Sequence, residues 1–163
     1  MLTSKMLIEN IVSDINNSTI SKVITEDQNK DYEGMLIQIE NNIYRSRLAK
    51  VTPKKSGYFV VFWEKDENDK NQPYSFADSP DKIIISIIDN DLRGQFIFPK
   101  SKLLEKGILS DETSKGKMGI RVYPSWVKAL NKTAAQTQKW QQHFFVDLSK
   151  DRERERLEEL YFN

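Results

Sequence analysis

Residues 82–90, KIIISIIDN, are apolar almost throughout, and this run restricts how the chain can fold more than any other feature. Isoleucine branches at Cβ, which favours strands, and the run does not alternate between polar and apolar residues. A strand with this pattern is buried on both faces of its sheet, so further layers must cover each face. The run is also far too short to span a bilayer, which takes about 20 residues of helix.

Other segments predict further strands of the same sheet. Residues 34–42 alternate between apolar and polar positions, and Asn41 and Asn42 are typical of a turn. Residues 66–81 form a long polar loop with two prolines. The remaining strands are predicted at residues 43–51, 58–65, 92–99 and 119–126.

Helices are predicted at residues 4–17, 102–108, 131–148 and 151–162. Ser4 and Ser101 are the expected N-caps of the first two, and Gly107 is the expected stop of the second. The third should turn Ala134, Trp140 and Phe144 inward. Together these elements predict one α/β domain over residues 1–163, with a central mixed sheet flanked by helices. A charged helical tail is expected at about residues 147–163.

Composition excludes several kinds of site. The 163 residues include no cysteine, so neither a disulfide framework nor a thiolate metal site can form. A single histidine, His143, cannot build a multi-histidine metal centre and is expected to be structural. The first residues carry acids and lack a long apolar core, so no signal peptide is expected and a cytoplasmic location is the default.

The net charge of +1 hides an uneven distribution. Residues 1–42 hold 3 Lys/Arg and 7 Asp/Glu, giving −4; residues 43–142 hold 18 and 11, giving +7; residues 143–163 hold 4 and 6, giving −2. A basic middle between acidic ends indicates an anionic partner.

Cations and aromatic residues are interleaved in residues 43–65, IYRSRLAKVTPKKSGYFVVFWEK. Strand periodicity places Arg45 and Arg47 on one face, opposite Tyr44 and Leu48. Such cations could neutralise phosphates, and aromatic faces could stack on unpaired bases. The alternative is ordinary protein surface and core, in which Arg47 and Lys50 pair with an acid such as Glu40.

Several long motifs resemble the MepB family. They are AKVTPKKSGYFVVFWEKDENDKNQPY, GQFIFPKSKLLEKGILS, GKMGIRVYPSW and AQTQKWQQHFF, and the resemblance covers roughly residues 32–148. It implies a restriction-endonuclease-like core of the PD-(D/E)XK type, shared by many metal-dependent nucleases. Family members often carry a basic pair after the tryptophan, whereas this chain has Glu64 there, which weakens an anion contact at that point.

Nucleases of that fold need an aspartate and an acid-x-lysine triplet to hold divalent cations and to activate water. No Asp-x-Lys or Glu-x-Lys occurs in the chain. Phe98 precedes Lys100 where the acid would stand, and Asp91 is followed by Arg93, which is too basic to act as a general base. Neither a catalytic residue, a metal nor a cofactor is therefore predicted. A metal site built from scattered acids, such as Glu33, Asp81, Asp89 and Asp91, is the alternative.

The sequence thus predicts a non-catalytic nucleic-acid-binding protein with a degenerate nuclease fold, which favours single-stranded DNA or RNA over duplex DNA. The alternatives are a metal-dependent nuclease with relocated acids and a protein-interaction module that docks a partner through residues 151–163 and the VYPSW segment. Trp63 and Trp140 are expected in the core, and Trp126 is balanced between core and surface. The candidate binding residues are Arg45, Arg47, Lys50, Lys54, Lys55, Tyr58, Arg93, Gln95, Lys100, Lys102, Arg121, Tyr123 and Trp126.

Overall fold

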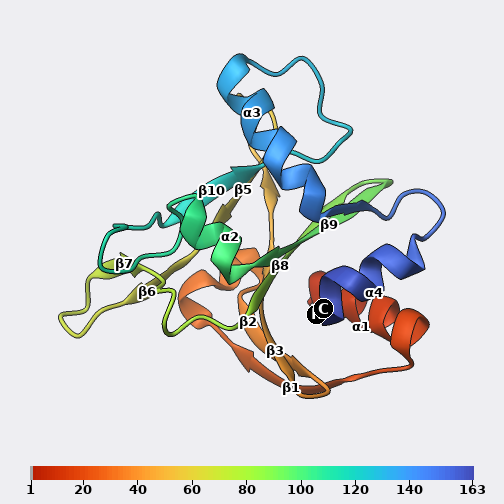
Figure 1. Ribbon diagram of the computed structural model, residues 1–163, viewed down its shortest axis with the longest axis horizontal. Coiled ribbons are helices and arrows are strands. Elements are labelled where there is room, and N and C mark those ends of the chain that lie inside the picture. Colours follow the sequence, from red (N-terminus) through yellow and green to blue (C-terminus); the bar gives the residue numbers. More distant parts are fainter. Residues whose placement is uncertain (1) are drawn as a thin grey trace.

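The computed structural model describes residues 2–163, and its centre is a six-stranded mixed sheet (Figure 1). The strand order is β1-β2-β3-β8-β9-β11, and every pair is antiparallel except β3 and β8. The predicted α/β domain with a mixed central sheet is confirmed. The strands are β1 (Ile20–Thr25), β2 (Met35–Ile39), β3 (Asn42–Leu48), β8 (Lys82–Asp89), β9 (Leu92–Pro99) and β11 (Phe145–Asp147).

Strand β8 is buried on both faces, as its sequence predicts. Ile83, Ile85 and Ile87 face one core, and Ile84 faces another on the opposite side of the sheet. Each of these side chains is at most 1% exposed. Two hydrophobic layers therefore meet at this strand.

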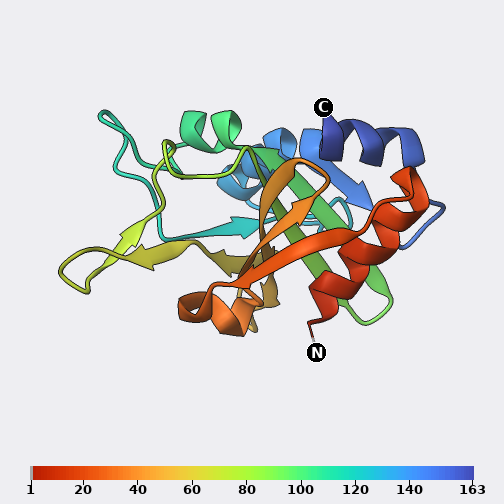
Figure 2. The same ribbon diagram turned by 90° about the horizontal axis from the view of Figure 1, so that it is seen from below.

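Two helices, α1 (Thr3–Asn16) and α4 (Arg154–Phe162), cover one face of the sheet side by side (Figure 2). Helix α1 contributes Leu7, Ile8 and Ile11 to the core of this face, and α4 contributes Leu157 and Tyr161. The expected tail is therefore part of the folded core.

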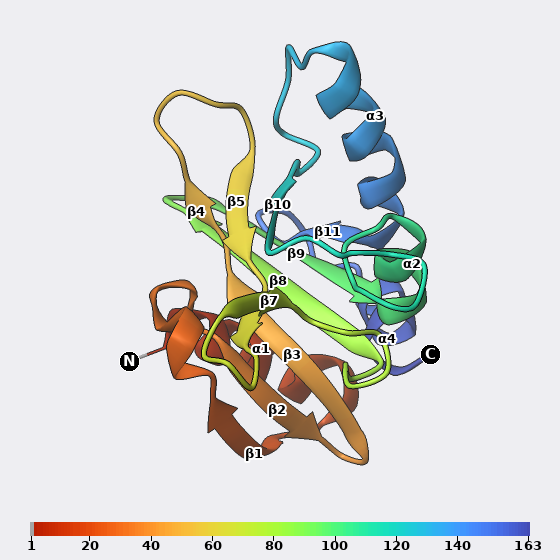
Figure 3. The ribbon, with the colours of Figure 1, turned by 90° about the vertical axis from the view of Figure 1, so that its left-hand side faces the viewer.

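The other face is covered by smaller elements (Figure 3). A three-stranded sheet of order β10-β5-β4 packs there with two helices, α2 and α3, and with the β6–β7 hairpin. The β4–β5 loop and α3 stand at the same end of the molecule, with β10 between them. The elements are β4 (Lys50–Val51), β5 (Tyr58–Val61), β6 (Trp63–Lys65), β7 (Asn71–Pro73), β10 (Gly119–Val122), α2 (Lys100–Glu105), α3 (Lys132–Gln141), and the 3-10 helices η1 (Asp27–Tyr32) and η2 (Gln142–Phe144).

Several segments differ from their prediction, including residues 43–51, which divide between β3 in the main sheet and β4 in the three-stranded sheet, and the predicted loop 66–81, which contains β7. Strand β1 lies between the predicted helix 4–17 and the predicted strand 34–42, where no strand is predicted, and the predicted strand 58–65 divides at Phe62 between two different sheets. The predicted helix 131–148 ends at Gln141, and Phe145–Asp147 instead forms β11 against β9. In this segment, pairing with the free edge of β9 outweighs the helical periodicity of the sequence.

The predicted caps are also corrected. The N-cap of α1 is Leu2, and Ser4 lies inside the helix. The first free backbone N–H groups are satisfied by Glu33, whose carboxylate accepts from Ser4 N at 2.8 Å and from Thr3 N at 3.3 Å. Helix α2 begins at Lys100 after Pro99, not after Ser101. Within residues 2–163, no helix is both long and apolar enough to cross a membrane.

Candidate nucleic-acid interface

A groove runs along β10, between the β4–β5 loop and α3, and consists of two adjoining hollows of about 460 Å³ each. Lys55, Arg121 and Tyr123 line both hollows and so form the boundary between them. We call the two hollows together the basic groove. Its other lining residues are Lys54, Ser56, Leu130, Asn131, Thr133 and Ala134 on one side, and Phe59, Lys106, Ile108, Lys117, Gly119, Ile120, Thr137, Trp140 and Gln141 on the other.

The charge of the basic groove has one sign. Lys54, Lys55 and Arg121 line the first hollow, and Lys106 and Lys117 join them in the second. No aspartate or glutamate is among the described residues that line either hollow. Positive charge concentrated between low-dielectric walls attracts polyanions more strongly than the same charges scattered over a surface.

Arg121 fastens the β4–β5 loop at the rim of the groove. Its guanidinium donates to the Ser56 carbonyl at 3.1 Å and to Thr52 Oγ1 at 2.7 Å. Gly57 closes the loop with a φ of +80°, and a Cβ there would lie 2.6 Å from the Tyr123 ring. A side chain would therefore be both strained and blocked at Gly57. These contacts fix the backbone on either side of Lys54 and Lys55.

Amide side chains attach α3 to the opposite wall. Buried Gln141 accepts from the Tyr123 backbone N–H at 2.9 Å and donates to the Arg121 carbonyl at 3.0 Å. Asn131 caps the helix by accepting from the Ala134 N–H at 2.9 Å. The helix thus turns Thr133, Thr137 and Trp140 toward the groove. Trp140 packs on Phe98, with ring centroids 5.4 Å apart, but it is half-buried at the margin of the core rather than inside it as expected.

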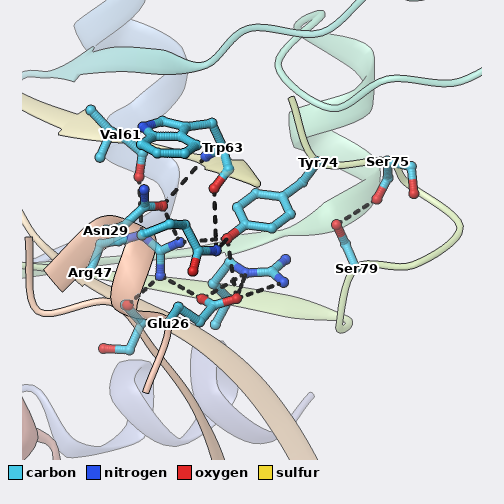
Figure 4. Close-up of polar contacts among 11 residues, drawn as sticks. Glu26, Asn29, Arg47, Val61, Trp63, Tyr74, Ser75 and Ser79 are labelled. Carbon is cyan, nitrogen blue, oxygen red and sulfur yellow. Dashed lines mark hydrogen bonds and ion pairs between the residues drawn. The ribbon is translucent and has the colours of Figure 1, made fainter. Parts of the chain in front are cut away.

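Arg45 and Arg47, two of the predicted binding residues, lie elsewhere, inside the protein. They are 5% and 0% exposed, and both pair with the carboxylate of Glu26 at 3.1 and 2.7 Å. Figure 4 shows Arg47, Glu26, Asn29 and Tyr74 pointing toward one another. The prediction that these arginines line a nucleic-acid surface is wrong, because η1 and Tyr74 cover their face of the strand.

Glu26 is the residue that the sequence analysis missed in this cluster. Burial alone would raise the pKa of its carboxyl, but the charges and hydrogen bonds of Arg47 and Arg45 outweigh burial and lower that pKa below its ordinary value of 4.5. Arg47 also donates to Asn29 Oδ1 and to the Tyr74 hydroxyl. The signal available in the sequence was a strand face that carries two arginines and needs an acidic partner. That partner is Glu26 rather than Glu40.

Three more predicted residues are buried. The Tyr58 hydroxyl donates to Asp89 at 2.7 Å, and burial together with Asp89 raises its pKa to about 12. Gln95 is 0% exposed and bonds to Tyr161 and Ser86 on the α1–α4 side. Tyr123 lines the groove but is only 9% exposed, packed against Gly57. The stacking surfaces expected from Tyr58 and Tyr123, and the phosphate or base contact expected from Gln95, are therefore absent.

The remaining predicted residues lie outside the groove. Trp126 is half-buried, donates to the Tyr58 hydroxyl and packs edge-on against Phe145. Lys100 donates to the carbonyls of Phe76 and Ser79, and Lys102 pairs with Glu105. Lys50 and Arg93 are exposed, and the ammonium of Lys50 lies over the Tyr32 ring. Whether any of them contacts nucleic acid stays a prediction.

Lys106 and Lys117 are groove residues that the sequence analysis did not select. A usable signal was the stretch 113–146, which contains six lysines and arginines and no acid. It supplies Lys117, Arg121 and the whole of α3 to the groove. Lys106 directly follows α2 and reaches the groove only through packing, so no local pattern identifies it.

The acids proposed for a relocated metal site do not come together. Glu33 caps α1, Asp81 and Asp89 lie at opposite ends of β8, and Asp89 accepts from Tyr58. Among the described residues, no group of three or more acids or histidines could hold a metal ion. The VYPSW segment is no free arm either, since Val122, Tyr123 and Pro124 are buried.

Comparisons with known proteins place the chain in a family. A family model described as MepB-like matches residues 26–147. A crystal structure of MepB is 47% identical in sequence, with a TM-score of 0.81, over 93% of this chain and 100% of that chain. The structure of a bacterial homing endonuclease, I-Ssp6803I, is 12% identical, with a TM-score of 0.44, over 84% of this chain and 85% of that chain, a likeness too low to support a conclusion. No curated protein matches the chain. The chain belongs to the MepB-like family.

Proposed function

We propose that this protein binds nucleic acid through the basic groove and does not cut it. The observation that carries the proposal is that five cations and no acid line two adjoining hollows. Polyanion binding needs lysines and arginines that release counterions from phosphates, and it tolerates few carboxylates nearby. The β4–β5 loop, the residue after α2, the segment before β10 and β10 itself supply the cations, and α3 adds a wall without acids.

The proposal includes a preference for single strands. Each hollow has about 460 Å³, within the range of about 300–1,000 Å³ that bound ligands occupy. We propose that one strand enters these hollows and that a duplex rests on their rims. This support comes from the shape of the groove, because the aromatic faces expected to stack on bases are largely buried.

Binding without cleavage rests on the sequence and on the buried cluster. The chain has no acid-x-lysine triplet, and the carboxylate of Glu26 is held by two guanidiniums. We also propose that the core of the protein derives from the PD-(D/E)XK nuclease fold. The support for this is the initial helix and the three antiparallel strands β1–β3, followed by parallel β8. A cytoplasmic location also belongs to the proposal.

Fluorescence anisotropy tests the proposal with labelled single-stranded RNA, single-stranded DNA and duplex DNA, each with and without Mg²⁺, at two salt concentrations. We expect salt-sensitive binding that favours single strands and leaves every probe intact. The variant Lys54→Glu/Lys55→Glu should bind at least about tenfold more weakly. The matched control Lys22→Glu/Lys150→Glu changes the charge equally at two exposed sites outside the groove and should bind as the unmodified chain does.

Two outcomes would favour the alternatives. Cleavage with Mg²⁺ or Mn²⁺ that Asp81→Ala abolishes would establish a nuclease. Absence of binding to every probe, together with a partner from cell lysate that survives nuclease treatment, would establish a protein-interaction module.

A further inference from the structure

Two aromatic rings of the basic groove, those of Trp140 and Phe59, each contact a cation and another part of the protein. The Lys106 ammonium lies 5.4 Å from the centroid of the Trp140 ring, and Phe98 packs against the same ring. The Arg121 guanidinium lies 5.8 Å from the centroid of the Phe59 ring. The backbone at Gly119 meets that ring so closely that a Cβ there would lie 2.6 Å from Phe59 Cζ. These rings hold cations in place through cation–π contacts and offer little free face to a base.

The amide oxygens of the groove are also occupied. Amides read adenine edges and carboxylates read cytosine edges, whereas Lys and Arg can contact guanine as well as phosphate. Gln141 is 1% exposed and uses its oxygen and its nitrogen on the backbone of β10 and the residue after it. The oxygen of Asn131 caps α3, and the Thr137 hydroxyl donates to the Thr133 carbonyl. Apart from its cations, little is left in the groove that could distinguish one base from another.

The lysines, in contrast, are available. Lys54, Lys55 and Lys117 are exposed, and within residues 2–163 none of them forms an ion pair or a side-chain hydrogen bond. Lys106, besides its cation–π contact with Trp140, has a loose contact with Glu105 at 3.8 Å. Ammonium groups bind phosphate as point charges, without regard to the attached base.

We infer that the basic groove recognises the phosphodiester backbone of one nucleic-acid strand and is indifferent to its bases. This inference rests on the proposed function and specifies its ligand: the sugar-phosphate chain itself. Lys54 and Lys55 meet phosphates in the first hollow, and Lys106 and Lys117 meet them in the second. Arg121 holds the loop and lies over Phe59, so it is a positioning residue and not the main phosphate contact.

The test compares a single-stranded DNA probe with an abasic strand of equal length, which keeps every phosphate and lacks every base. We expect dissociation constants within about twofold of each other, because phosphate contacts are unchanged. Stacking of even one base would weaken the abasic strand by about fivefold or more. Homopolymers of thymidine, cytidine and adenosine should also bind alike.

The variant Lys54→Glu/Lys55→Glu should weaken the normal and the abasic strand by the same factor. The Lys22→Glu/Lys150→Glu control should weaken neither. A normal strand that binds at least fivefold better than the abasic strand would overturn the inference and leave the proposed function standing. Failure of both strands to bind would overturn the inference and the proposed function together.

Discussion

One carboxylate, that of Glu26, receives both buried arginines, so the cluster holds two positive charges and one negative charge away from water. Arg45 stacks on Tyr74, with its guanidinium carbon 3.5 Å from the ring centroid, and its Nη1 has no hydrogen-bond partner among the described atoms. Burying a charge is costly unless it is paired, so this cluster depends on one acid. Glu26 therefore connects β3 to the start of η1 and to the Tyr74 hydroxyl, which donates to the same carboxylate.

We predict that Glu26→Gln lowers the free energy of unfolding by about 3–5 kcal/mol, because it leaves two buried guanidiniums without a counter-charge. Urea denaturation followed by circular dichroism measures the change. Glu67→Gln, at an exposed position, is the control and should stay within about 0.5 kcal/mol of the unmodified chain. A loss below about 1 kcal/mol for Glu26→Gln would show that the pair is not important for stability.

The lowered pKa of Glu26 also predicts a pH dependence. A carboxyl whose pKa is lower in the folded chain stabilises the fold above its unfolded pKa, near 4.5, and loses this contribution as the pH falls through the folded pKa. The difference in stability between the unmodified chain and Glu26→Gln should therefore be largest near pH 7 and shrink below about pH 4. Denaturant titrations at several pH values measure it, and a constant difference across this range would contradict the assignment.

At the scale of elements, the β4–β5 loop and α4 are polar segments whose conformation depends on contacts with the rest of the protein. The loop holds its shape through Arg121 from β10, and α4 is anchored by Leu157 and Tyr161 in the core. Asp14 of α1 binds both Arg152 and Arg154 at the start of α4. Both segments are polar in sequence and ordered through their partners.

Arg121→Ala should loosen the β4–β5 loop, since it removes two hydrogen bonds whose net contribution is about 1 kcal/mol each. Amide hydrogen exchange over residues 52–57 should accelerate about fivefold or more, with no nucleic acid present. Arg93→Ala, at an exposed arginine outside the groove, is the control. Unchanged exchange in Arg121→Ala would mean that the loop keeps its shape without this side chain.

Leu157→Ala should lower the free energy of unfolding by about 2–5 kcal/mol, because Leu157 is 0% exposed and its removal leaves a cavity between α4 and the sheet. Glu158→Ala on the exposed side of the same helix should change stability by less than about 0.5 kcal/mol. Thermal or urea denaturation measures both. Equal, small effects would indicate that α4 contributes little to the stability of the core.

The whole molecule carries a net charge of only +1, yet its charges are separated in space. The basic groove lies at the end that holds the β4–β5 loop, β10 and α3, while α1 and α4 cover the opposite face of the main sheet. An isoelectric point near 7.8 therefore says little about polyanion binding by this chain. The distribution of charge rather than its sum should govern association.

If the four groove lysines each neutralise one phosphate of a single strand, the plot of log K against log salt should have a slope of about −3, at about −0.7 per contact. Anisotropy titrations at several salt concentrations measure this slope. Substituting Lys117→Gln should reduce its magnitude by about 0.7, and Lys22→Gln should leave it unchanged. A slope near zero would show that binding is not electrostatic.

Much of the architecture could be predicted from sequence, because the isoleucine run of β8 requires a layer on each side. Strand β1 could not be predicted, since Ser21 and Lys22 interrupt its apolar pattern. It forms a strand because it pairs with β2. Likewise, Phe145–Asp147 becomes a strand only because the edge of β9 lies beside it. In the site, Lys54 and Lys55 were identifiable as a charged loop. Lys106 and the burial of Arg45 depend on contacts between distant segments, which local patterns do not encode.

The position of strand β1 affects how readily the protein associates with other chains at high concentration. This strand forms one edge of the main sheet, with Ile24 49% exposed, and an open edge can recruit strands from other chains into aggregates. The register of β1 shifts between Ile20 and Lys22, and the exposed Lys22 follows the shift. Bulges twist an edge away from a straight partner, and a lysine there repels its copy on a second molecule. We therefore expect the irregular register of β1 and Lys22 to oppose pairing of this edge with a strand of another chain.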